Sequence, residues 1–250
     1  MKAMIFAAGL GTRLRPLTND RPKALVEIEG RTLLEIALAR LREFGVREVV
    51  VNVHHFADKV VEYLKARDGF GMRIAISRED KLLLDTGGGL KKAAEFFLGD
   101  ARAVEGEEPI VVHNVDVLST IDLAKMVEAH RKRKALVTLA VQERKTSRYL
   151  LFDEEMLLCG RRIGEMATAE VVRRSRRALP LAFAGIHVVS PRIFAGLTED
   201  GAFSIVTSYL RLAGEGESIA GFRVDGAYWR DVGRLDDLER AAEDLRAGRV

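Results

Sequence analysis

The sequence predicts a Rossmann-like, three-layer α/β fold with a mixed, mainly parallel central sheet. In the first half of the chain, short β-branched segments alternate with amphipathic helical segments. That order typically gives parallel strands with helices on both faces of the sheet. The chain has 250 residues, of which 48% are hydrophobic and 31% charged, so it can bury a sizeable core within a single domain.

Strands and helices are expected in a regular order in the first half. Runs rich in apolar and β-branched residues predict strands at 2–7, 47–53, 72–77, 109–113 and 136–141. Apolar residues at helical spacing predict helices at 32–44, 57–65, 89–97 and 123–131. Gly45 directly follows the first of these helices and can end it as a cap.

The second half is less regular. Apolar patterning predicts a hairpin of 149–152 and 157–159, strands at 182–189 and 219–224, and helices at 203–213 and 235–245. Residues 160–179 hold six arginines and show little apolar periodicity, so we expect a mobile loop there. We find no fixed-period repeat and no low-complexity linker.

Composition excludes several classes of function. The net charge is only +3, from 40 basic and 37 acidic residues, which is too balanced for a nucleic-acid-binding surface over the whole chain. The lone Cys159 excludes a disulfide framework and a multi-cysteine metal site, and it suits a reducing compartment. The apolar run at residues 3–8 is too short for a signal peptide, and no segment approaches the roughly 18 apolar residues of a membrane span. We therefore expect a cytoplasmic protein with no membrane or nucleic-acid partner.

A glycine-rich loop follows the first predicted strand. Gly9 and Gly11 allow several backbone N–H groups to approach one phosphate without Cβ clashes. A dinucleotide fingerprint is excluded because Leu14 stands at its third glycine, Pro16 interrupts the helix, and the next strand ends at Asn52 rather than at an acid. The Gly-Lys-Ser/Thr of a P-loop is also absent.

The loop and four later segments resemble the sugar-phosphate nucleotidyltransferases, also called NDP-sugar pyrophosphorylases. The signature covers 9–18 and Arg21-Pro22-Lys23, and the later segments are 86–89, 114–116, 183–186 and 229–233. The chain is most similar to the short, single-domain uridylyl- and guanylyltransferases of N-acetylmuramate and mannose 1-phosphates. The resemblance implies a nucleotide-diphospho-sugar transferase fold and one domain over 1–250, with a nucleotide-binding part at about 1–115 and a sugar-binding part at about 116–250.

The resemblance also implies the reaction and its residues. A sugar 1-phosphate attacks the α-phosphorus of a nucleoside triphosphate, pyrophosphate leaves, and cations stabilise the charge. Arg13 would bind the β- and γ-phosphates and Lys23 the phosphates near the reacting centre, while Asp116 and Asp231 would hold Mg²⁺. The implied nucleotide-binding residues are Ala8, Gly9, Gly11, Thr12, Arg13, Lys23, Thr86, Gly87, Gly88 and Asn114. The implied sugar-binding residues are Phe183, Gly185 and Asn114.

The chain departs from the family pattern at two places. Val115 replaces the usual glycine before Asp116, which predicts ordinary strand backbone at that residue. The Lys-Pro element that binds the sugar phosphate in many relatives is missing after 153–156, so Arg148, Arg173 or a neighbouring arginine could replace it. The arginine run at 173–177 could equally be a solvated surface.

Several assignments remain open from the letters alone. Asp85 either accepts a hydrogen bond from the base or caps the following helix. Asn52 or His54 could line the nucleotide pocket, whereas His113 is expected in the core. UTP with an N-acetylmuramate or N-acetylglucosamine phosphate is the preferred substrate pair, and GTP with mannose or heptose 1-phosphate is the alternative. A catalytically silent regulatory homologue is the alternative of a different class, and the protein is expected to be a monomer or a homodimer.

Overall fold

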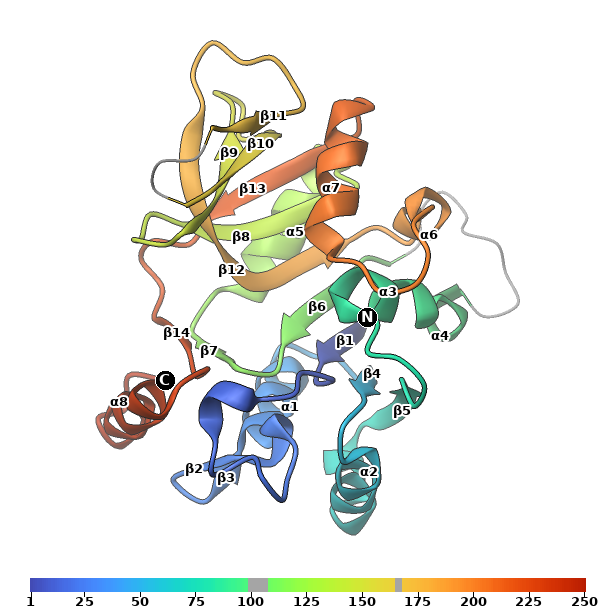
Figure 1. Cartoon of the computed structure of the whole chain (residues 1–250), viewed down its shortest axis with the longest axis vertical. Coiled ribbons are helices and arrows are strands. Elements are labelled where there is room, and N and C mark those ends of the chain that lie inside the picture. The colour runs from blue at the N-terminus through green and yellow to red at the C-terminus, as the bar shows by residue number, and fades with distance from the viewer. Residues whose placement is uncertain (99–107, 165–167) are drawn as a thin grey trace.

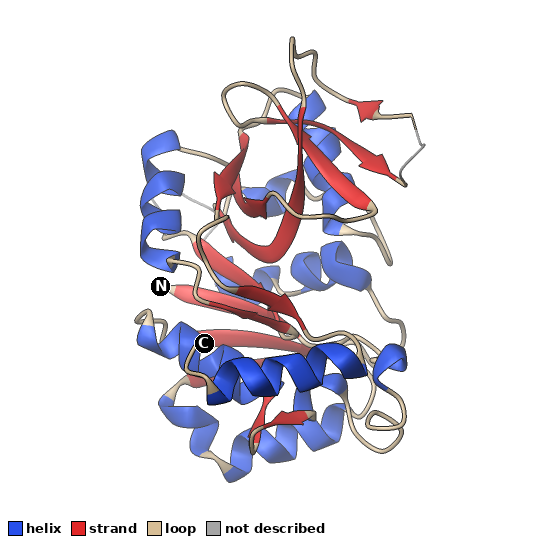
Figure 2. Cartoon of the chain, turned by 90° about the vertical axis from the view of Figure 1, so that its left-hand side faces the viewer, coloured by secondary structure: helices blue, strands red, loops and turns tan. Residues whose placement is uncertain are grey.

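The protein is described here by a computed structural model that covers residues 1–98, 108–164 and 168–250. One ten-stranded sheet runs through the length of the molecule, and helices pack on both of its faces (Figures 1 and 2). Its strands are β1 (Lys2–Phe6), β4 (Glu48–Val53), β5 (Arg73–Arg78), β6 (Ile110–Asn114), β8 (Val137–Gln142), β9 (Arg148–Phe152), β10 (Leu158–Ile163), β11 (Glu170–Val171), β12 (Leu179–Val189) and β13 (Ile219–Arg223).

Two short strand pairs lie outside this sheet. They are β2 (Glu27–Ile28) with β3 (Arg31–Thr32), and β7 (Val117–Ser119) with β14 (Trp229–Asp231). The α-helices are α1 (Leu33–Glu43), α2 (Ala57–Ala66), α3 (Asp85–Lys92), α4 (Ala94–Leu98), α5 (Leu123–Arg133), α6 (Ile193–Gly196), α7 (Ile205–Gly214) and α8 (Leu235–Arg246). The 3-10 helices are η1 (Thr12–Leu14), η2 (Lys23–Leu25) and η3 (Asp68–Gly71).

The main path of the sheet runs β11-β10-β9-β12-β6-β1-β4-β5, and β8 pairs with both β12 and β13. Strands β6, β1, β4 and β5 are parallel to one another, whereas β12 is antiparallel to β6, β8 and β9. The long β12 thus joins a parallel half to a mainly antiparallel half, in which β13 runs parallel to β8. The predicted α/β fold with a mixed central sheet is confirmed.

Both faces of the sheet are buried at β1. Ala3 and Ile5 belong to one apolar cluster with α1 and α2, and Met4 and Phe6 belong to a second cluster with α3 and α7. Alternate side chains of a strand point to opposite faces, so a strand covered on both faces is a continuous apolar run. This is why 2–7 is recognisable as a buried strand in the sequence.

Three local predictions were wrong. The helix expected at 89–97 begins at Asp85, so the three glycines lie inside α3. Within 160–179, β10 continues to Ile163 and β11 forms at 170–171, because both segments pair along the antiparallel half of the sheet; residues 165–167 of that expected loop lie outside the described part. Val115 has no positive φ, but it lies in a turn between β6 and β7 rather than in a strand.

Pairing of β14 with β7 has no signal in the sequence, since each strand has only three residues. In the described ranges, no helix is both long and apolar enough to cross a membrane.

Candidate active site

The loops of the glycine-rich motif and of Asp116 meet at one edge of the sheet. Phe6, the last residue of β1, is in register with Asn52 on β4 and with Asn114 on β6. Because parallel strands end at the same edge, their following loops converge there. Strand order places β6 and β4 on either side of β1 (Figure 1).

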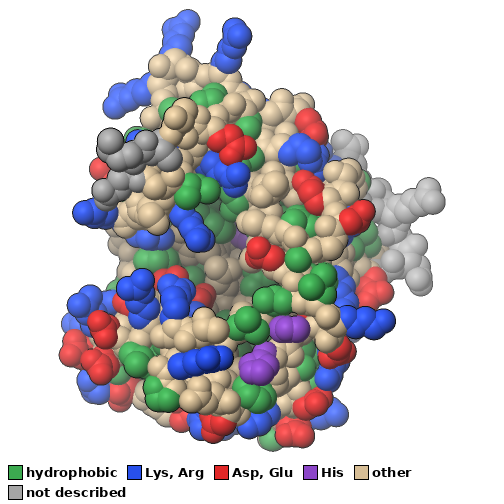
Figure 3. All heavy atoms as spheres, in the orientation of Figure 1, with side chains coloured by type: hydrophobic (Ala, Val, Ile, Leu, Met, Phe, Trp, Pro, Cys, Tyr) green, Lys and Arg blue, Asp and Glu red, His purple; other side chains and the backbone are tan. Residues whose placement is uncertain are grey.

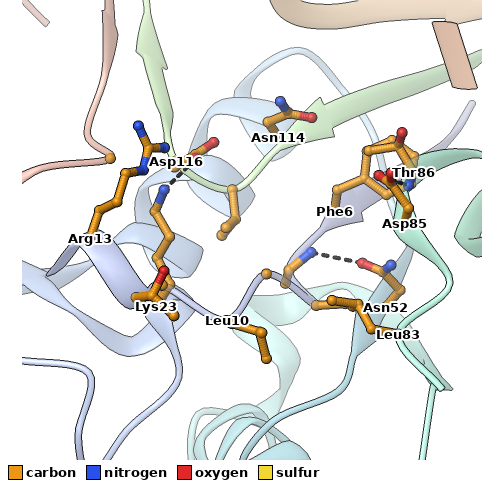
Figure 4. Close-up of a pocket in the computed structure, with 17 residues that line it drawn as sticks. Phe6, Leu10, Arg13, Lys23, Asn52, Leu83, Asp85, Thr86, Asn114 and Asp116 are labelled. Carbon is orange, nitrogen blue, oxygen red and sulfur yellow. Dashed lines mark hydrogen bonds and ion pairs between the residues drawn. The ribbon is translucent and has the colours of Figure 1, made fainter. Parts of the chain in front are cut away.

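A cavity of about 470 Å³ opens at this edge. Figure 4 shows Arg13, Lys23 and Asp116 on one side of it, and Asn52, Asp85 and Thr86 on the other. It is lined by Phe6, Ala7, Ala8, Gly9, Leu10, Gly11, Thr12, Arg13, Lys23, Asn52, Leu83, Asp85, Thr86, Asn114, Val115, Asp116 and Gly233. Of the residues predicted to bind nucleotide, all but Gly87 and Gly88 are in this lining.

The glycine-rich loop is folded tightly against the lysine segment. Gly11 has a φ of 64°, and a Cβ there would lie 3.0 Å from both Lys23 Cβ and Thr18 Cγ2. The Thr18 hydroxyl donates a hydrogen bond to the Gly11 carbonyl (2.9 Å). Only glycine combines this backbone conformation with so close an approach. The fold of the loop therefore sets Lys23 beside Gly11.

Lys23 and Arg13 surround a pair of carboxylates. The buried Lys23 ammonium donates to Asp116 Oδ2. Antiparallel pairing of β14 with β7 brings Asp231 alongside, with the Val232 amide donating to the Asp116 carbonyl (2.9 Å). A Cβ at Gly233 would lie 2.7 Å from Asp231 Oδ1 and 2.8 Å from Arg13 Nη2. Both carboxylates and both cations therefore lie together at one end of the cavity.

The environment of Asp231 favours a bound cation. Burial raises the pKa of the Asp231 carboxyl, the negative charge of Asp116 raises it further, and the positive charges of Lys23 and Arg13 oppose the rise. Two carboxylates in such proximity repel each other unless a cation lies between them. In the described chain, no three His, Cys, Asp or Glu side chains converge on one point, so any metal held here would complete its shell with substrate or water oxygens.

A buried polar network joins the two walls of the cavity. Asn52 accepts a hydrogen bond from the Ala7 amide (2.7 Å) and donates to Glu79 Oε1 (2.8 Å), while Glu79 Oε2 accepts from the Leu84 amide (2.8 Å). Glu79 is only 1% exposed, and sequence reasoning missed it. A lone acid after a strand carries no local signal, and its role follows from where Asn52 and Leu84 lie in the fold. His54 contacts the Glu79 carbonyl and is not part of the cavity lining.

The three glycines of α3 allow close packing within the protein. A Cβ at Gly87 would lie 2.2 Å from the Phe203 ring, and one at Gly88 would lie 2.4 Å from the Gly201 carbonyl oxygen. Packing against these protein atoms alone requires glycine at both positions, so contact with a nucleotide is not needed to explain them. Asp85 lines the cavity, and its carboxylate accepts from the Thr86 amide (2.6 Å).

Of the predicted sugar-binding residues, Phe183 and Gly185 lie on β12, and Asn114 is the last residue of β6. Gly185 has a φ of 74°, and a Cβ there would lie 2.8 Å from Asn114 Nδ2. The Trp229 indole donates to the Ala184 carbonyl (2.7 Å), which fastens β14 to β12. The glycine therefore makes room for Asn114, which lines the cavity and also contacts β12.

Other sequence candidates lie elsewhere. Arg173 donates to the Glu217 carbonyl (3.2 Å), and Arg148 is exposed. The run at 173–177 lies between β11 and β12, at the end of the molecule away from β1 (Figure 1). His113 is buried, contacts the Asn114 carbonyl (2.7 Å), and its pKa is lowered to about 4, chiefly by burial. The neutral, enclosed imidazole of His113 thus packs in the core and contacts the backbone of Asn114.

Comparison with known proteins identifies the family of the chain. Residues 2–151 match the model of the nucleotidyl transferase family, and the chain belongs to that family. Over 250 residues it is 38% identical to N-acetylmuramate alpha-1-phosphate uridylyltransferase of Caulobacter vibrioides, a match that covers 98% of this chain and 96% of that protein. It is 30% identical to mannose-1-phosphate guanyltransferase of Yarrowia lipolytica, covering 95% of this chain and 62% of that protein.

A solved structure shares the fold over nearly the whole chain. The structure of HddC from Yersinia pseudotuberculosis, complexed with GMP-PN, superposes with a TM-score of 0.75 at 21% identity, covering 98% of this chain and 99% of that one. The predicted family and fold are confirmed by these matches, as is the predicted class of enzyme, a sugar-1-phosphate nucleotidyltransferase.

Proposed function

We propose that the protein transfers a uridylyl group from UTP to N-acetylmuramate α-1-phosphate, forming the UDP-sugar and pyrophosphate. The observation that supports this reaction is the pair of carboxylates, Asp116 and Asp231, beside Lys23 and Arg13 at the end of a cavity lined by the glycine-rich loop. The choice of base and sugar rests on the similarity to the Caulobacter uridylyltransferase. Guanylyl transfer to mannose 1-phosphate is the second candidate, favoured by the similarity to the Yarrowia enzyme.

Mg²⁺ fits the acidic pair. Carboxylate oxygens are the ligands that Mg²⁺ prefers, and Asp116 lies close enough to Asp231 for its negative charge to add to the effect of burial in raising the pKa of Asp231. When bound, the ion would neutralise charge on the reacting phosphates. Asp116 and Asp231 would hold it.

The remaining residues would bind and align the two substrates. In the reaction, an oxygen of the sugar phosphate forms a bond to the α-phosphorus, the bond from that phosphorus to the β-phosphate oxygen breaks, and pyrophosphate leaves with the electron pair. Backbone amides at Gly9–Thr12 would cradle the triphosphate. Arg13 would stabilise the departing pyrophosphate and Lys23 the α-phosphate. Asn114 would contact both substrates, from a position between the cavity and β12.

The chain would work as one domain with two parts. The nucleotide part, about residues 1–115, contains the parallel strands β1, β4, β5 and β6 and most of the cavity lining, to which the other part adds Asp116 and Gly233. The sugar part, about residues 116–250, contains β12 and the β7–β14 pair, which carry Gly185 and Asp231. The reacting phosphates would meet at the boundary between the two parts.

A pyrophosphate-release assay tests this function. UTP, GTP, CTP and ATP are each combined with N-acetylmuramate, N-acetylglucosamine and mannose 1-phosphates, with Mg²⁺ and with EDTA. We expect the highest kcat/KM for UTP with the muramate, and release only with the metal. Asp116→Asn and Asp231→Asn should lower kcat at least about a hundredfold, since several kcal/mol of charge stabilisation depend on the metal. The exposed Asp58→Asn is the matched control. Absence of release in every combination would refute the proposal.

A further inference from the structure

Arg144 is held in place with no acidic partner among the described residues. It lies between β8 and β9, and its Nη2 donates to the Phe183 carbonyl on β12 (3.0 Å). Its guanidinium carbon lies 4.1 Å from the centroid of the Trp229 ring. Nε is buried with no hydrogen-bond partner, and no carboxylate in the described ranges forms an ion pair with this residue. The guanidinium therefore has unused donors and a fixed plane.

Arg144 lies on the same side of β14 as Asp231. Trp229 and Asp231 are alternate residues of this strand, so their side chains project from one face. Arg230, between them, projects the other way and pairs with Asp244 on α8 (2.6 Å). Stacking on Trp229 thus places Arg144 on the acidic side of the strand. Burial lowers the pKa of Arg144, and the negative charge of Asp231 opposes this decrease, which agrees with the two groups facing each other.

The other cations near Asp231 lie on the side of the cavity. Lys23 pairs with Asp116, and Arg13 lies against Gly233 in the cavity lining. Arg144 approaches from β12, the side opposite the nucleotide cavity. In the space-filling view, Lys and Arg side chains border both sides of the hollow between the two halves of the molecule (Figure 3). An anion placed beside the acidic pair on the β12 side would meet Arg144 first.

We propose that Arg144 binds the phosphate of the sugar 1-phosphate and aligns it for attack. This inference rests on the proposed function. A sugar phosphate carries two negative charges, and a planar guanidinium with free N–H groups can bind such a group through two parallel hydrogen bonds. Trp229 and the Phe183 carbonyl hold the guanidinium in one orientation before substrate arrives, so little conformational freedom is lost on binding. In this chain, Arg144 would take the role of the lysine of the Lys-Pro element that is missing after 153–156.

Steady-state kinetics of three substitutions test the assignment. Arg144→Ala removes the guanidinium, Arg144→Gln replaces it with a shorter uncharged polar group, and Arg144→Lys keeps the charge. We expect Arg144→Ala and Arg144→Gln to raise the KM for the sugar 1-phosphate roughly tenfold to a hundredfold, with the KM for UTP changed less than twofold. Arg144→Lys should recover part of the loss. Arg67→Ala is the matched control, because it removes a guanidinium 4.4 Å from the Tyr63 ring, away from the cavity.

Binding provides a readout that does not need turnover. Trp229 is the only tryptophan of the chain, so its emission should change when a sugar 1-phosphate is added to wild-type enzyme. The titration midpoint should shift to about tenfold higher concentration or more in Arg144→Gln. An unchanged KM and an unchanged midpoint in a folded, active Arg144→Gln variant would overturn the assignment. Lack of turnover by wild-type enzyme would instead count against the proposed function.

The lactyl carboxylate of a muramate is a second anion that could attract Arg144. N-acetylglucosamine 1-phosphate has the phosphate but no carboxylate, so the same titration with this compound separates the two. A similar loss of affinity for both sugars in Arg144→Gln supports phosphate binding. Loss for the muramate alone would overturn it.

Discussion

Replacing Asp244 by Asn should loosen the strand that carries Asp231. Asp244 lies on α8, and its side chain is 8% exposed. Asp244 Oδ2 accepts from the Tyr228 hydroxyl and from two nitrogens of Arg230, Nε (2.9 Å) and Nη2 (2.6 Å). Asp244 Oδ1 accepts from Arg249 Nε (2.8 Å). Arg230 directly precedes Asp231, and Tyr228 lies three residues before it. In the variant, an amide NH₂ would face at least one of these donors.

The expected loss of stability follows from these contacts. A hydrogen bond to a charged group contributes about 1.5–3 kcal/mol, and breaking a buried pair costs more than the pair contributes. Arg249 is 54% exposed, so water replaces most of its share. Loss of the bonds from Arg230 and Tyr228 should lower the free energy of unfolding by about 2–4 kcal/mol. Displacement of Asp231 should also lower kcat about tenfold or more.

The pH dependence of this loss has a definite sign. Hydrogen bonds from Tyr228, and then from Arg249 and Arg230, hold the pKa of Asp244 well below the ordinary aspartate value, against the effect of burial. The stabilisation is therefore complete above the unfolded-state pKa near 3.8 and is lost as the pH falls below it. The difference between wild type and Asp244→Asn should be constant from pH 6 to pH 8 and shrink below pH 4.

Urea unfolding followed by Trp229 emission measures the free energy of unfolding and its dependence on pH, and steady-state assays measure kcat. Glu243→Gln, an exposed substitution on the same helix, is the control and should change the free energy of unfolding by less than about 0.5 kcal/mol. Equal stability and equal kcat in Asp244→Asn and wild type would show that the network does not support Asp231.

Three further outcomes are expected. Arg13→Ala should lower kcat at least about a hundredfold while leaving the urea midpoint nearly unchanged; a turnover close to wild type would contradict its role at the phosphates. Gly88→Ala should destabilise the protein by about 1–3 kcal/mol, because its Cβ would lie 2.4 Å from the Gly201 carbonyl oxygen, whereas Gly226→Ala, with no atom within 4 Å of its Cβ, should be neutral in the same unfolding experiment. Burial lowers the pKa of His187 from 6.5 to about 3, so the unfolded state binds the extra proton and stability falls as the pH drops below 6.5. His187→Phe should make that decrease shallower by up to about 1.4 kcal/mol per pH unit between pH 6 and pH 4, and an unchanged slope would show that His187 is protonated in the folded protein.

The sequence determined most of the longer strands and helices and the position of the glycine-rich loop. The apolar run of β1 is readable because the strand is covered on both faces, and α1 is readable because its apolar spacing lies between Thr32, which caps it (Thr32 accepts from the Glu35 amide at 3.0 Å), and Gly45. Gly11 is readable because a left-handed turn beside Lys23 excludes a side chain. Each of these signals depends on residues that are neighbours in the sequence, so a short segment is enough to recognise it.

Only the tertiary structure decided which distant residues meet. Asp116 and Asp231 come together through the β7–β14 pair, whose three-residue strands show no periodicity. The glycines of α3 are explained by Phe203 and Gly201, and the importance of Glu79 by Asn52 and Leu84. Arg144 stands out because it stacks on Trp229 without an acidic partner in the described ranges. Such contacts depend on long-range packing, which a single sequence read segment by segment does not contain.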